Sequence, residues 1–128
     1  MSACLASILE LPLDEVIDTT SDEVRDVIGF HEAISLWLGD RGLKLEIVCP
    51  GEGPEEEALL NGRYSIGIGP SPRGNFNHAV VCKNGKMVFD PHPADDGLLS
   101  MTYHEVIVEL SDAEKRFHEL NRRSRFFD

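Results

Sequence analysis

The segment "NHAVVCKNGKMVFDPHP" (77–93) constrains the fold of this chain more than any other stretch of the sequence. Apolar and β-branched residues stand on both sides of Asn84-Gly85, and an Asn-Gly pair in this setting is the strongest local signal for a β-hairpin. We therefore predict two antiparallel strands joined by a tight turn.

The length of the hairpin loop decides which side chains of the two strands share a face. With Asn84-Gly85 as a two-residue loop, His78 stands opposite Pro91, and His78 and Asp90 point to opposite faces. With a three-residue loop ending in a left-handed bulge at Gly85, His78 lies directly opposite Asp90. The longer loop also places the apolar side chains of Ala79, Val81, Met87 and Phe89 together on the other face of the hairpin. We therefore predict the three-residue loop and a His78–Asp90 pair with Cβ atoms about 5 Å apart.

The pattern of apolar residues changes along the chain from a helical period to alternation. The predicted elements beside the hairpin are helices at 3–11, 21–40 (bent or interrupted at Gly29) and 111–125, a helical turn at 55–60, and strands at 43–49, 63–69 and 104–110. Ser111 and Glu114 form a capping box at the start of the last helix. Helices followed by antiparallel strands favour an α+β fold, with the N-terminal helices packed on a twisted antiparallel sheet of four to six strands.

The length of 128 residues suits a single domain. We divide it into a helical part (1–42), an antiparallel sheet (43–110) and a C-terminal helix (111–128). Glycines in 63–69 mark places where a neighbouring segment or a ligand could approach the strand closely.

Charge and cysteine content exclude several classes of protein. Twenty-three acidic against twelve basic residues give a formal charge of −11, which disfavours binding to nucleic acid or to anionic membranes. Three cysteines without close pairing predict neither a disulfide framework nor a zinc site. The sequence has no apolar run of membrane-spanning length and no signal-peptide pattern, so we expect a cytoplasmic protein.

Three residues carry the parts of a nucleophilic site. Cys4 stands near the N-terminus of a predicted helix, where the helix dipole lowers the pKa of a thiol. His78 and Asp90 add a general base and the carboxylate that orients it. We therefore predict Cys4, His78 and Asp90 as catalytic residues. The alternative for Cys4 is a place in the core, since it shares a helical stripe with Ile8 and Leu11.

Three stretches carry a resemblance to a known family: "ACLASILELPLDEV", "GPSPRGNFNHAVV" and "MVFDPHP". They resemble papain-like cysteine peptidases and are similar to small phage and bacterial proteins akin to the peptidase domain of bacteriocin-processing transporters. The resemblance implies a papain-like fold, with the base on His78 and the orienting carboxylate on Asp90. The family pattern is commonly Asp-Cys-x-x-x-Cys/Ser-Leu-Ala, and "ACLA" matches its second half. On that alignment the reactive thiol falls one residue before Met1.

The leading hypothesis is a cysteine hydrolase that acts on an amide bond of a peptide or protein substrate and needs no cofactor or metal. Acyl transfer or deamidation by the same residues is equally allowed. The alternatives are a catalytically inactive papain-like binding domain and an N-terminally truncated form of the enzyme that lacks its nucleophile. His92, Asp95 and Asp96 are expected to be solvated loop residues rather than metal ligands, and Cys82 is expected in the core. The oligomeric state is left open.

Overall fold

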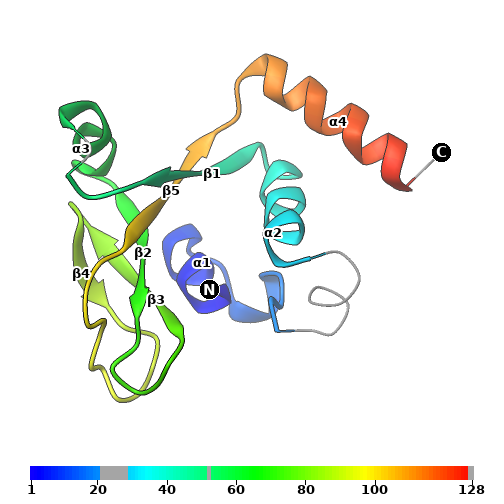
Figure 1. Cartoon of the computed structure of the whole chain (residues 1–128). Coiled ribbons are helices and arrows are strands. Elements are labelled where there is room, and N and C mark those ends of the chain that lie inside the picture. Colours follow the sequence, from blue (N-terminus) through cyan, green and yellow to red (C-terminus); the bar gives the residue numbers. More distant parts are fainter. Residues whose placement is uncertain (21–28, 52, 127–128) are drawn as a thin grey trace. The chain divides into compact units, whose positions relative to one another are not determined.

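The structure is a computed structural model that describes residues 1–20, 29–51 and 53–126. In chain order its elements are α1 (Ser2–Leu9), the short 3-10 helix η1 (Leu13–Glu15), α2 (Phe30–Gly39), β1 (Leu43–Val48), α3 (Pro54–Leu60), β2 (Tyr64–Pro70), β3 (Asn77–Lys83), β4 (Lys86–Phe89), β5 (Tyr103–Glu109) and α4 (Asp112–Phe126) (Figure 1).

The strands form one five-stranded antiparallel sheet in the order β1-β5-β2-β3-β4. β2 pairs with β3 on one side and with β5 on the other. The predicted α+β class, with helices before the sheet and one helix after it, is confirmed. The strand that follows the hairpin in sequence, β5, returns to pair with β2 rather than with β4.

The described chain divides into two compact units. The first comprises Met1–Val16 and Glu46–Val106, and the second comprises Ile17–Leu45 and Ile107–Asp128. α1, α3 and the strands β2 to β4 belong to the first unit, whereas α2 and α4 belong to the second. All three predicted catalytic residues fall in the first unit.

α1 packs on β2 and β3 in the first unit. Cys4 and Leu5, in its first turn, are completely buried. The helix ends where Glu10 adopts a left-handed conformation (φ 56°), and Pro12 prevents its continuation. The observed helix begins and ends within two residues of the predicted one.

Two glycines of β2 allow other groups to lie against the strand, as the sequence predicted. A Cβ atom at Gly67 would lie 2.7 Å from Met101 Sδ and 2.8 Å from Cys82 Sγ, and one at Gly69 would collide with the carbonyl oxygen of Ser100. Side chains at these two positions are therefore excluded by close packing. The approaching group at Gly69 is the protein's own chain on its way to β5.

The second unit is built around α2 and α4, which contact each other. α2 begins at Phe30, directly after Gly29 (φ 92°), in agreement with the predicted interruption; the predicted helical residues 21–28 lie outside the described part of the chain. α4 begins with the predicted capping box, in which the Ser111 amide donates to Glu114 Oε1 (3.0 Å) and the Glu114 amide donates to Ser111 Oγ (3.2 Å). Among the described helices none is both long and apolar enough to cross a membrane.

Candidate active site

The turn between β3 and β4 has two residues, so the predicted three-residue loop is wrong. Lys83 pairs with Lys86, and Asn84 (φ 54°) and Gly85 (φ 77°) both take the left-handed conformation of a type I′ turn. The side chain of Asn84 accepts a hydrogen bond from the Gly62 amide (2.6 Å). This contact with a distant segment favours the shorter turn.

A β-bulge restores the relation between His78 and Asp90 that the shorter turn would have broken. Cys82 pairs with Met87 but Val81 pairs with Phe89, so Val88 is an extra residue in β4. Continued by one position, this register places Asp90 opposite Val80. Val80 and His78 share a face because they are two residues apart in one strand. His78 and Asp90 thus meet on one face as a diagonal pair rather than a directly opposite one.

The carboxylate of Asp90 is completely buried and accepts three hydrogen bonds. His78 Nε2 lies 2.7 Å from Oδ1, the His92 amide donates to the same oxygen (2.9 Å), and the Gly97 amide donates to Oδ2 (2.9 Å). Burial alone would raise the pKa of Asp90, but the hydrogen bonds from His78 and from the two amides outweigh it and lower the pKa to about 2. Asp90 is therefore ionised at neutral pH.

The charge of Asp90 determines which nitrogen of His78 carries the proton. An ionised carboxylate can only accept, so Nε2 must be the donor in the 2.7 Å contact. In the neutral ring, Nδ1 then has the lone pair. The His78 side chain is 16% exposed, and the ring of His92 stands edge-on to it at 6.3 Å between centroids. The predicted His78–Asp90 pair is confirmed, and its geometry makes Nδ1 the atom that can accept a proton.

Cys4 lies near this pair but has the features of an inert thiol. Its residue is completely buried, and burial is the main reason that its pKa is raised to about 11. The α-amino group lowers the pKa and the charges of Asp90 and Cys82 raise it, which places Cys4 within electrostatic range of all three. At neutral pH the thiol is protonated, and no solvent reaches it in this conformation.

The loops around His78 are held by contacts that the sequence did not reveal. Arg73 pairs with Asp96 (2.9 Å) and so joins the loop before β3 to the loop after β4. Gly97, whose amide holds Asp90, has φ 67°, and the run "DDG" at 95–97 is the only local signal for that turn.

Around the pair, the described His, Cys, Asp and Glu side chains form no group that could hold a metal ion. Nowhere in the described part of the chain do three His, Cys, Asp or Glu side chains converge as a metal site requires. His92 uses its Nδ1 to accept a hydrogen bond from the Ala94 amide (3.0 Å) within the loop. Cys82 is buried, as predicted.

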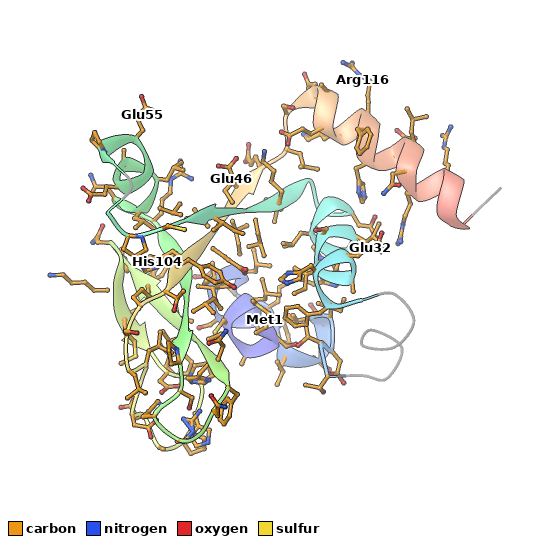
Figure 2. All side chains as sticks on the ribbon, viewed as in Figure 1. Met1, Glu32, Glu46, Glu55, His104 and Arg116 are labelled. Carbon is orange, nitrogen blue, oxygen red and sulfur yellow. The ribbon has the colours of Figure 1, made fainter. Side chains whose placement is uncertain are left out.

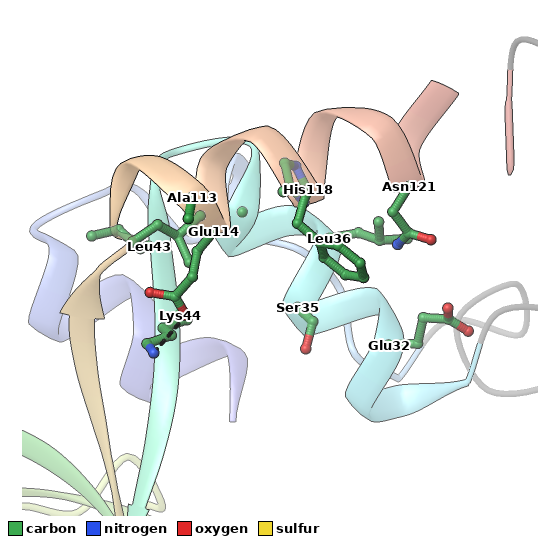
Figure 3. A pocket seen from close by; sticks show the side chains of 12 residues that line it. Glu32, Ser35, Leu36, Leu43, Lys44, Ala113, Glu114, His118 and Asn121 are labelled. Carbon is green, nitrogen blue, oxygen red and sulfur yellow. Dashed lines mark hydrogen bonds and ion pairs between the residues drawn. The ribbon is translucent and has the colours of Figure 1, made fainter. Parts of the chain in front are cut away.

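A cavity of about 630 Å³ in the second unit lies between α2, α4 and the chain around Leu43 (Figure 3). Leu36 and Phe117 give it apolar walls. Two ion pairs involve residues that line it: Lys44 with Glu114 at 2.7 Å, and His118 with Asp40 at 2.9 Å. All three cysteines of the chain belong to the first unit, so thiol chemistry is confined to that unit.

Comparisons of this chain with protein-family models, with curated proteins and with solved structures give no match. The functional assignment therefore depends on the geometry of the site.

Proposed function

We propose that this chain has a papain-like α+β fold and carries the acid–base half of a cysteine hydrolase that acts on an amide bond of a peptide or protein. In this proposal His78 is the general base and then the general acid, and Asp90 positions its ring. The observation that carries the proposal is the 2.7 Å contact between His78 Nε2 and a buried, ionised Asp90, which leaves Nδ1 as a proton acceptor.

The chemistry follows from that tautomer. Nδ1 takes the proton of a thiol while the sulfur attacks the amide carbon, and a C–S bond forms. Nδ1 then gives the proton to the leaving nitrogen as the C–N bond breaks. A water molecule attacks the thioester and gives its proton to Nδ1, and the C–S bond breaks to regenerate the thiol. Asp90 stabilises the imidazolium that forms twice in this cycle. An amine in place of water gives acyl transfer, and a side-chain amide as substrate gives deamidation.

The identity of the cysteine whose thiol gives its proton to His78 needs a direct test. Cys4 is a candidate by its proximity to Asp90, but its burial and its pKa of about 11 oppose a nucleophilic role. The papain-like resemblance instead indicates a thiol at the N-terminal end of α1, one position before Met1. Met1 lies at the start of α1, and α1 contacts β3, the strand of His78 (Figure 2).

The experiment compares two thiols in one chain: Cys4 and a cysteine added, as Asp-Cys, before Met1. Alkylation by iodoacetamide is followed against pH and assigned to each cysteine by mass spectrometry. We expect Cys4 to react only after unfolding. We expect the added thiol to react with a midpoint below pH 7, and the midpoint to return to about 8.5, the value of an unperturbed thiol, in His78→Ala.

His92→Ala is the matched control because its ring is a close neighbour of His78 yet lies outside the proton path. It is expected to leave the midpoint of the added thiol unchanged. A midpoint near 8.5 in the parent chain, or equal shifts in both histidine variants, would rule out His78 as the base. Fast alkylation of Cys4 below pH 7 in the native chain would instead make Cys4 the nucleophile.

The alternative function is that of a non-catalytic papain-like binding domain. The complete burial of Cys4 favours it, because a binding domain has no need of an accessible thiol. The same experiment separates the two functions: an added thiol that is indifferent to His78, together with an unreactive Cys4, favours the binding domain.

A further inference from the structure

A second cavity of the first unit, of about 430 Å³, is distinct from the site of His78 and Asp90. The residues that line it come from the end of β1, from α3, from the hairpin turn and from β5: Val48, Cys49, Pro50, Gly51, Glu57, Leu60, Asn61, Asn84, Gly85, Met101 and His104. Three of these can do chemistry together: the thiol of Cys49, the imidazole of His104 and the carboxylate of Glu57.

Cys49 differs from the other two cysteines in its exposure. Cys4 and Cys82 are completely buried, whereas Cys49 is partly exposed and lines the cavity. A reagent that enters the cavity from solvent can therefore reach this thiol without unfolding the protein.

His104 provides a polar group that is buried by the protein and directed into the same cavity. Only 2% of the residue is exposed, and its Nδ1 lies 3.1 Å from the hydroxyl oxygen of the fully buried Ser65. Its Nε2 faces Gly85, where a Cβ atom would lie 3.9 Å away, and Gly85 is part of the cavity wall. Figure 2 shows His104 on its strand in the first unit (Figure 2).

The hydroxyl of Ser65 determines what His104 offers to a ligand. Among the described residues, Nδ1 is the only hydrogen-bond partner of this buried hydroxyl; we assign the hydroxyl as the donor because that gives its proton an acceptor, which places the ring proton on Nε2. Burial lowers the pKa of His104, so the ring is neutral at pH 7. The cavity therefore contains an N–H donor that can stabilise a negatively charged sulfur.

The charge of the cavity wall selects among reagents. Glu57 is an exposed residue at the wall, and the described lining residues include no Lys or Arg. The chain as a whole has a net charge of −11. Such a field attracts cationic small molecules and repels anionic ones.

We propose that Cys49 is a modification site for small cationic aliphatic disulfides, which enter this cavity and form a mixed disulfide. The thiolate of Cys49 attacks one sulfur of the disulfide, a new S–S bond forms, and the old S–S bond breaks. The leaving thiolate takes up the proton that Cys49 released. The oxidant is the disulfide itself. The N–H of His104 stabilises the thiolate of Cys49 before the exchange and the leaving thiolate after it. This site is independent of the proposed hydrolase.

The test uses two disulfides of similar size and opposite charge, cystamine and 3,3′-dithiodipropionate, on the full chain. At about 10 mM ionic strength we expect cystamine to modify Cys49 roughly tenfold faster. The difference is expected to shrink at 0.5 M salt, where the Debye length is only about 4 Å. Cys4 and Cys82 are internal controls that stay unmodified, and Cys49→Ser is expected to abolish the reaction.

Two variants of one helix locate the source of the selectivity. Glu57→Gln is expected to reduce the preference for cystamine several-fold. Glu55→Gln removes the same charge from α3 outside the cavity wall, and its side chain points away from the strands, so the preference is expected to persist (Figure 2). Equal effects of the two variants, or equal rates for the two disulfides, would overturn the charge selection.

Nitrogen NMR of His104 provides a readout that does not depend on rate. The unmodified protein is expected to show the Nε2–H tautomer, and the Nε2 signal is expected to shift when cystamine modifies Cys49. A modified Cys49 with an unchanged His104 signal would show that the ligand does not occupy this cavity. An unmodified Cys49 in the folded protein would refute the site altogether.

Discussion

Asp90 and Glu114 have the same lowered pKa, about 2, in two very different surroundings. Asp90 is in the first unit, where its carboxylate is completely buried and held by His78 and two backbone amides. Glu114 is in the second unit, where its side chain is 40% exposed and is held by Lys44 and by the capping box with Ser111.

The comparison teaches that an equal pKa shift does not mean an equal contribution to stability. Water and salt screen the pair of Glu114 with Lys44, and exposed pairs of this kind contribute little. The hydrogen-bond donors around Asp90 are in the interior, where water and salt do not screen them in this way. Each would remain as an unsatisfied polar group if the carboxylate were lost. We therefore expect Asp90 to dominate the acid stability of the chain.

The largest effect is expected for Asp90→Asn. The amide has nearly the shape of the carboxylate, but its NH₂ group faces a donor whichever way it is oriented, so one buried hydrogen bond is replaced by a repulsive contact. We expect a loss of about 2–3 kcal/mol in the free energy of unfolding in urea at pH 7. Asp95→Asn, a neutralisation in the same loop at an exposed residue, is the control and is expected to change little. Equal losses of stability in Asp90→Asn and Asp95→Asn would show that a buried carboxylate contributes no more than an exposed one in this loop.

An intermediate effect is expected from pH. Because the folded-state pKa of Asp90 is about 2 and the unfolded-state value is about 3.9, the unfolded chain binds the proton first. This contribution is fully present above about pH 5, and most of it, about 2 kcal/mol, is lost as the pH falls toward 2. Urea unfolding between pH 6 and pH 2 measures it. The decline in stability should be shallower in Asp90→Asn than in the parent chain. In the parent chain 0.5 M salt should leave the decline nearly unchanged. If salt removed the decline, exposed carboxylates rather than Asp90 would be its cause.

The smallest effect is expected for Glu114→Gln. The amide oxygen can still accept from the Ser111 amide, and the Glu114 backbone amide still donates to Ser111 Oγ, so the variant loses the ion pair with Lys44 but keeps both hydrogen bonds of the capping box. We expect a small destabilisation at low salt that disappears at 0.5 M, since exposed pairs are screened. Ser111→Ala removes the cap itself and should cost about 1 kcal/mol at either salt concentration. A loss in Glu114→Gln as large as that in Asp90→Asn would show that exposure does not separate the two carboxylates.

Features that depend on neighbouring residues could be predicted from the sequence. The Asn-Gly turn, the capping box at Ser111, the end of α1 before Pro12 and the interruption at Gly29 just before α2 each follow from local backbone preferences. Their order along the chain was enough for the α+β class. The pairing of His78 with Asp90 was also predicted, although from the wrong loop: the turn is one residue shorter and the bulge at Val88 compensates.

Features that depend on distant residues were decided by the tertiary structure. The amide of Gly62 holds Asn84 in the short turn, and the amide of Gly97 completes the cradle of Asp90. Burial by the sheet raises the pKa of Cys4, although its place near a helix N-terminus suggested a lowered one. The environment of His104 and Cys49 was likewise invisible in the sequence. A residue's type and spacing specify its local conformation, but its solvation and its partners come from segments that only the folded chain brings together.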